Sequence, residues 1–325
     1  MHDASDVDLE RLRRCSRLPS RDLERRQNDG FNRLLLAAGL ELREVVVLRA
    51  YCRYLLQTGL PFSQLLMERV LANHATITRQ LRTTLSEVRF QLDIGAKTRD
   101  KEMARFDRAI VKALTGVRSA DDDRILRAYL RAIRATLRTN FHQTPRRWWL
   151  GNHGCHSFDP QRLPDQRCRG RSSRSCLQSA GRGVHLRMGF VARGGIRWSD
   201  RREDFRTEVL GLMKAQNVKN TLIVPVGHRG FFPKRLPHGG SRDDVQREVI
   251  ASYRTFIRGL LDVTDNIVGG KVVPRDCLVR HDGDDAYLVV AADKGTATFS
   301  TSPMRSPSNT ASGLAMHLPP GLGWL

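Results

Sequence analysis

The chain has 325 residues, 40% of them hydrophobic and 27% charged, a balance typical of a globular protein with room for two domains. No run of about 18 apolar residues occurs, and the charged N-terminus lacks the apolar core of a secretory signal, so we expect a cytoplasmic protein without a membrane span. The net charge of +21 is spread along the chain as arginine, without zinc-finger spacing or an aromatic RNA-binding motif, which disfavours specific nucleic-acid binding. Six cysteines in so long a chain do not suggest a disulfide scaffold, and we expect them to be reduced.

Residues 1–30 form a charged lead-in, and residues 31–150 have the apolar periodicity of helices. The clearest helix spans 44–56, and further helices are predicted over 62–73, 76–90 and 121–140. The last of these begins with three aspartates, which the helix dipole favours at an N-terminus. It also carries a basic stripe made of Arg127, Arg131, Arg134 and Arg138. That stripe is open to three interpretations: a phosphate-binding face, a solvated helix face, or a face that docks on an acidic partner domain.

Residues 151–183 are an atypical segment, rich in arginine, serine and glycine, in which hydrophobic periodicity disappears. A metal site is one interpretation, with a spacing that does not match paired zinc ligands; its candidate ligands are His153, Cys155, His156, Cys168 and Cys176. A disordered linker is the second interpretation. The third interpretation is a stretch translated out of frame, because a GC-rich gene read in the wrong frame yields arginine-, serine- and glycine-rich sequence without periodicity.

Periodicity returns over residues 184–300, where strand and helix patterns alternate. Strands are predicted at 185–190, 221–226 and 286–292, with helices after Ser199-Asp200 and after Ser241. Tight glycine turns are expected at Gly227–Gly230 and at Gly269-Gly270. The fold class expected for the whole chain is therefore an all-α region followed by an α/β segment with a mixed sheet. Ligands in such sheets bind at the carboxyl ends of strands.

Long motifs in this segment identify a resemblance. The stretches RGGIRWSDRREDFRTEVLGLMKAQNVKN, IVPVG, FFPKRLP and RHDGDDAYLVVAADKGTATFS resemble the large bacterial NAD-specific glutamate dehydrogenases. The resemblance is dense over 184–300 and looser over the helical region. It implies oxidative deamination of L-glutamate to 2-oxoglutarate in amino-acid catabolism, with NAD as the cofactor, and a homo-oligomeric family.

The resemblance also assigns site residues. It implies that Arg193, Gly194, Gly195, Gln216 and Lys219 line the glutamate pocket, with Lys219 on one substrate carboxylate and Arg193 able to pair with the other. Asp293 matches the aspartate that exchanges a proton with the amino or imino nitrogen. Four of these six positions have ordinary structural alternatives: a helix cap for Asp293 or Lys219, and a plain turn for the two glycines.

The chain departs from the family pattern in two places. Where the family has a catalytic lysine after VPVG, this sequence has Arg229, which stays protonated and cannot act as a base. No G-x-G-x-x-G motif follows a strand, so we expect the NAD-binding domain to be absent, and residues 301–325 look like an unstructured tail. Breaks at 151–183 and after Phe299 fit frameshifts. We therefore predict a truncated glutamate dehydrogenase fragment, inactive alone; the alternative is a basic helical module that binds nucleic acid or an acidic partner.

Overall fold

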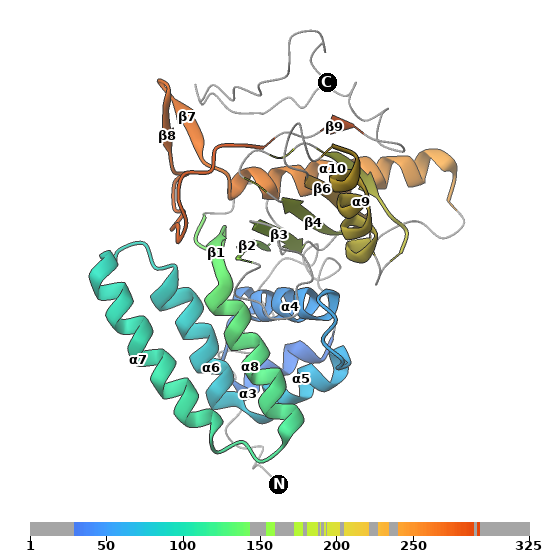
Figure 1. Cartoon of the computed structure of the whole chain (residues 1–325). Helices are drawn as coiled ribbons and strands as arrows, with labels where there is room; N and C mark the ends of the chain where they lie inside the picture. The colour runs from blue at the N-terminus through green and yellow to red at the C-terminus, as the bar shows by residue number, and fades with distance from the viewer. Residues whose placement is uncertain are drawn as a thin grey trace.

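The computed structural model describes residues 29–143, 154–159, 172–177, 181–187 and, with short gaps, 189–292. The first part is helical, as predicted, and the second is a sheet flanked by helices (Figure 1). The expected fold class is thus confirmed. Among the described residues, no helix combines the length and the apolar character needed to cross a membrane.

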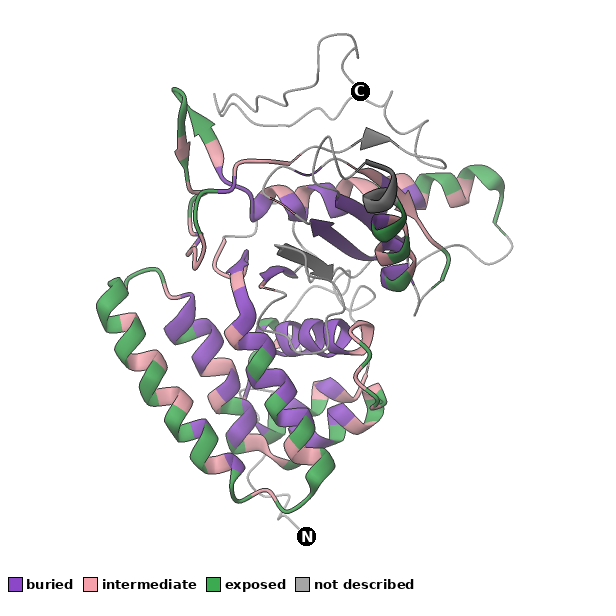
Figure 2. Ribbon diagram, viewed as in Figure 1, coloured by how far each residue is buried: buried purple, intermediate pink, exposed green. Residues whose placement is uncertain are grey.

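The helical region is a bundle built around one apolar cluster. Its elements are η2 (Gly30–Arg33), α3 (Leu34–Ala37), α4 (Leu42–Gln57), α5 (Gln64–Asn73), α6 (Ala75–Thr83), η3 (Thr84–Arg89), α7 (Ala96–Leu114) and α8 (Ala120–Ala135). Buried apolar side chains from these elements form one cluster, which includes Leu48, Leu81 and Tyr129. Helix α7 is the most exposed of these helices (Figure 2). Ser63 and Ser119 begin α5 and α8 by accepting hydrogen bonds from backbone N–H groups three residues later, which explains where these helices start.

Helix α4 connects the bundle to the sheet. It is buried nearly all round, unlike the amphipathic outer helices, because the bundle covers one side and the sheet the other (Figure 2). Tyr54 stacks on Phe158 of the sheet, with ring centroids 4.0 Å apart. The two parts of the chain therefore share apolar contacts at this helix.

The helix predicted over 121–140 was too long. Helix α8 ends at Ala135, and the chain continues as strand β1 (Thr136–Thr139). The Thr136 hydroxyl donates to the carbonyl of Ala132, and the Thr136 carbonyl accepts two hydrogen bonds from Arg89. Because side chains satisfy these backbone groups, the helix can end there without leaving them unpaired.

Within the described residues, seven strands form one sheet in the order β1-β2-β3-β4-β6-β5-β9. Besides β1, the sheet contains β2 (Gly154–Phe158), β3 (Ser172–Leu177), β4 (Gly181–Arg187), β5 (Gly195–Trp198), β6 (Gly227–Pro233) and β9 (Ala291–Ala292). Neighbours from β1 to β6 are antiparallel, whereas β6, β5 and β9 are parallel. Strands β2 and β3 lie inside the atypical segment, where the sequence showed no alternation. The division of the chain at 150 and 184 stays a prediction.

Two helices cover opposite faces of this sheet. Helix α9 (Phe205–Asn220) packs with Phe232, and α10 (Arg242–Asp262) packs with Phe231. Adjacent residues of a strand point to opposite faces, so the two apolar clusters are separated by the sheet. Ser241 and Asp244 form the predicted capping box at the start of α10.

Two local predictions were wrong and one was confirmed. The turn predicted at 227–230 is wrong, because these residues lie in strand β6. The strand predicted over 286–292 is too long, because of its described residues only Ala291-Ala292 forms a strand and 286–288 have no regular structure. The strand predicted over 221–226 lies outside the described residues. Packing explains why Gly230 lies within this strand, because a Cβ on Gly230 would lie 2.2 Å from the side chain of Val209 on α9. The turn at Gly269-Gly270 is confirmed, with positive φ at both residues, and it joins β7 (Asn266–Val268) to β8 (Lys271–Val273).

Candidate active site

The two predicted pocket glycines lie where strands β5 and β6 begin. A Cβ on Gly194 would fall 1.4 Å from the carbonyl oxygen of Gly227, so only glycine allows the two backbones to approach this closely. Gly195 opens β5, and the next residue, Ile196, is paired with Arg229 of β6. The structure therefore brings Gly194, Gly195 and Arg229 together near the point where β5 and β6 begin, a place that we call the glycine edge. Gly227 is the first residue of β6.

Arg229 is fully buried in the middle of the sheet. Its Nη1 donates to the carbonyl oxygen of Gly194 across 2.9 Å, and His185 of β4 is its register partner on the other side. Burial raises the pKa of Tyr253 on α10, and the positive charge of Arg229 opposes that shift. Arg229 and Tyr253 therefore act on each other on the α10 side of the sheet. A permanently protonated guanidinium at this place can donate hydrogen bonds and stabilise negative charge, but it cannot accept a proton.

The remaining predicted residues are only partly placed. Arg193 and Asp293 lie outside the described residues. Gln216 and Lys219 belong to the last turns of α9, and their side chains are also outside the description. Strand β9 pairs with β5 through Gly195 and Ala291, so the chain reaches Asp293 directly after a strand that adjoins the glycine edge.

Sequence reasoning missed Arg187, which lies at the same edge. It is the last residue of β4 and the register partner of Gly227. Its guanidinium is buried and pairs with Asp285, with Nη1 2.9 Å from one carboxylate oxygen. The sequence offers two weak signals: an arginine directly after the apolar Leu186, and the acidic run HDGDD much later in the chain. Because the partners are about a hundred residues apart in the chain, spacing alone does not reveal the pair.

The described ligands of the suggested metal site are not arranged around a common point. Cys155 is disulfide-bonded, which contradicts the expectation of reduced cysteines, and its register partner on β3 is Cys176. The buried ring of His156 lies against Tyr51, at 5.1 Å between centroids, and desolvation lowers its pKa to about 4. No cluster of three or more metal-ligating side chains occurs among the described residues. His153 and Cys168 lie outside them.

The basic stripe predicted on 121–140 is shorter than expected. Arg138 is not on the helix but is fully buried in β1. Arg127 pairs with Asp123 on its own helix, and Arg134 pairs with Asp107 of α7. The partners of these arginines are carboxylates of the same chain, which supports a solvated helix face over a phosphate-binding one.

Comparisons with known proteins show the family of the chain. Residues 109–307 match the family described as bacterial NAD-glutamate dehydrogenase, catalytic domain, and residues 26–92 match glutamate dehydrogenase, helical motif 3. NAD-specific glutamate dehydrogenases from Pseudomonas aeruginosa and Halomonas elongata are each 49% identical, over 91% and 84% of this chain. The protein of that name from Mycobacterium tuberculosis is 47% identical over 84%. The chain spans 18% of the length of the first relative and 17% of the other two. The chain belongs to the bacterial NAD-glutamate dehydrogenase family.

Proposed function

We propose that this chain forms the glutamate side of an NAD-dependent glutamate dehydrogenase, which oxidatively deaminates L-glutamate to 2-oxoglutarate and ammonia in cytoplasmic amino-acid catabolism. The observation that carries the proposal is the glycine edge, where the backbones of Gly194 and Gly227 meet in a chain of this family. Side-chain-free backbone of this kind gives a small carboxylate ligand access to N–H donors.

The roles proposed for individual residues follow the resemblance. Lys219 and Arg193 pair with the two carboxylates of glutamate, and Gln216 and the Gly194-Gly195 backbone complete the pocket. Asp293 exchanges a proton with the substrate nitrogen. Two cations for two carboxylates give the pocket the charge that a dicarboxylate requires.

Because Arg229 occupies the position of the family's catalytic lysine, we propose that this chain does not convert glutamate on its own. The reaction needs a base of lowered pKa to activate water and a positive group to stabilise charge at the α-carbon. Arg229 supplies only the positive charge, and its Nη1 is already engaged by the carbonyl of Gly194. We therefore expect the chain to bind the dicarboxylate and to fail at proton transfer.

The residues of this sequence do not supply the phosphate cradle that NAD needs. The connection from β5 to α9, residues 199–204, contains no glycine, and the motif G-x-G-x-x-G occurs nowhere in the sequence. NAD is the cofactor of the family, where it accepts the hydride.

Calorimetric titration of the full chain with 2-oxoglutarate tests the binding proposal. We expect binding that weakens at least tenfold in Lys219→Met, because one carboxylate loses its cation. Lys214→Met is the matched control: it changes the same residue type on the exposed side of the same helix and should leave binding unchanged. Equal weakening by both variants, or no binding by the wild-type chain at millimolar ligand, contradicts the proposal.

A further inference from the structure

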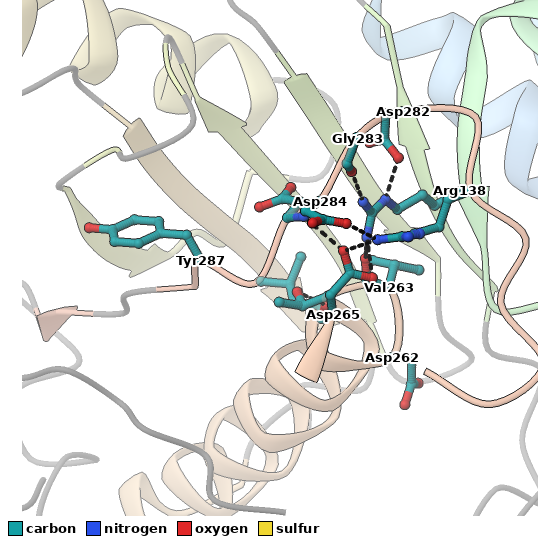
Figure 3. A network of polar contacts seen from close by, with 12 residues as sticks. Arg138, Asp262, Val263, Asp265, Asp282, Gly283, Asp284 and Tyr287 are labelled. Atoms are coloured by element: carbon teal, nitrogen blue, oxygen red, sulfur yellow. Dashed lines mark hydrogen bonds and ion pairs between the residues drawn. The ribbon is translucent and has the colours of Figure 1, made fainter. Parts of the chain in front are cut away.

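A buried ion-pair network connects β1 to the segment that leads into β9 (Figure 3). Arg138 and Asp265, both wholly shielded from solvent, lie 3.0 Å apart between Nη1 and Oδ1. The Arg138 Nε also donates to Asp282 across 2.7 Å. Its two terminal nitrogens donate to the carbonyls of Val263 and Gly283. One guanidinium thus holds two carboxylates and two backbone carbonyls.

Asp265 carries the network on to Asp285. Its Oδ2 accepts the N–H of Asp285 across 2.7 Å, and its own N–H donates to the Asp285 carbonyl across 3.0 Å. Arg280 adds a second cation, 2.9 Å from the same Oδ2. The carboxylate is therefore balanced by two arginines while it fixes the backbone of a residue twenty positions later.

Arg187 closes the network at the candidate active site. Its Nη1 donates to the Asp285 carboxylate across 2.9 Å and to the carbonyl of Tyr287 across 3.3 Å, and Nη2 makes a second bond to Asp285. The backbone of Arg187 pairs with Gly227, whose carbonyl packs on Gly194. The relay Arg138–Asp265–Asp285–Arg187 therefore runs from β1 to the glycine edge.

The segment held by this relay has no regular structure of its own. Residues 282–288 form neither helix nor strand, and they lead directly to β9, which pairs with Gly195 and Ile196. A buried charge is costly unless it is paired in good geometry, so the backbone groups that bind these buried arginines and aspartates cannot move away without a large loss of free energy. What it holds here is mainly backbone: the carbonyls of 263, 283 and 287 and the N–H of 285.

We propose that Arg138 and Arg187 are positioning residues of the candidate active site. They fix the segment 282–287 and thereby the placement of β9 beside the glycine edge. The inference rests on the proposed function for the identity of the site, but the placement itself does not depend on a substrate. The forked guanidinium is essential, because a single ammonium cannot reach a carboxylate and a carbonyl in different directions.

Hydrogen exchange of the full chain, measured by mass spectrometry, tests this placement. In Arg187→Lys and Arg138→Lys we expect amides of 284–292 to exchange at least tenfold faster, relative to amides of α4 in the same molecules. A global loss of stability would instead raise exchange in both places in proportion. Arg134→Lys, which alters the half-exposed pair with Asp107, is the control and should leave the ratio unchanged.

Asp282→Asn is a second variant for the case that a buried arginine cannot be replaced. Asp282 is partly exposed, so the chain should fold, and we expect a smaller rise, about threefold, in the same exchange ratio, since a hydrogen bond to a charged group is only weakened. Wild-type exchange ratios in the folded lysine variants would overturn the proposal. If the ratios change as expected but the wild-type chain does not bind 2-oxoglutarate, the positioning role stands and the proposed function fails.

Discussion

The helical region and the sheet are stabilised in different ways. In the helical region one continuous apolar cluster collects side chains from helices α3 to α8. In the sheet two smaller clusters lie on opposite faces, and the strands between them bring glycine backbones into contact. Both regions bury charged side chains, but in the sheet Arg187 and Arg229 lie on the strands next to these glycines. The helical region should therefore tolerate changes that conserve apolar volume, whereas the sheet should be sensitive to single added atoms and to the loss of individual partners.

The largest effect is expected at the glycine edge. In Gly194→Ala the new methyl group would overlap the Gly227 carbonyl, so β5 and β6 cannot keep their spacing, and we expect a loss of at least about 3 kcal/mol in unfolding free energy. Urea unfolding followed by tryptophan fluorescence, which includes Trp198 of β5, measures it. The control is Gly211→Ala in α9, where a Cβ meets no atom within 4 Å; it should stabilise by about 0.5–1 kcal/mol. A wild-type midpoint in Gly194→Ala would contradict the close approach.

A cavity in the helical cluster should have the next largest effect. Leu81 is fully buried, and Leu81→Ala should cost roughly 2–5 kcal/mol because the packed helices cannot close the space. Leu81→Met conserves volume and should cost less than about 1.5 kcal/mol. The same urea experiment measures both. Equal losses in the two variants would show that this region is not governed by apolar volume.

Acid should destabilise the chain through His156. Its pKa of about 4 in the folded state is below the ordinary 6.5, because burial disfavours the charged ring. The unfolded chain therefore binds a proton first, and stability that is present above pH 6.5 is lost as the pH falls toward 4, by about 2 kcal/mol at pH 5. His156→Leu should remove this loss in urea midpoints measured between pH 7 and 5. An unchanged pH slope in the variant would contradict the assignment.

The smallest effect is expected on the exposed face of α8. Arg127 pairs with Asp123 four residues earlier, at 2.7 Å, with both side chains open to solvent. Arg127→Ala should lower the unfolding free energy by no more than about 0.5 kcal/mol, and added salt should reduce the difference. Arg127→Lys, which keeps the charge, is the control. A loss above 1 kcal/mol in the alanine variant would indicate a partner that this surface does not show.

Sequence patterns predicted the parts of the fold that depend on neighbours in the chain. Helix periodicity and the Ser241 cap are local, and both were confirmed. Residues 227–230 were predicted to form a turn because of their glycines. In the folded sheet these glycines instead leave room for Val209 and for the Leu186 carbonyl, which lie far from them in the chain. Arg138 was counted in a helix stripe because its partner Asp265 is far along the chain.

The residues of the candidate site were likewise predictable where a continuous motif carries them, and not where they depend on contacts between distant parts of the chain. Family motifs led to Gly194, Gly195 and the Arg229 position, and the structure brings these three together. Arg187 was missed because its function depends on Asp285, a contact that no local spacing shows. The assignments of Arg193, Gln216, Lys219 and Asp293 stay predictions.

The most direct measurement is turnover of the purified full chain with L-glutamate and NAD, followed by NADH absorbance. If Arg229 replaces the base that the reaction requires, no NADH should form above background, even though the chain binds 2-oxoglutarate. Turnover at an ordinary enzymatic rate, about 1 per second or faster, would contradict the claim that this chain has a substrate pocket without a competent base.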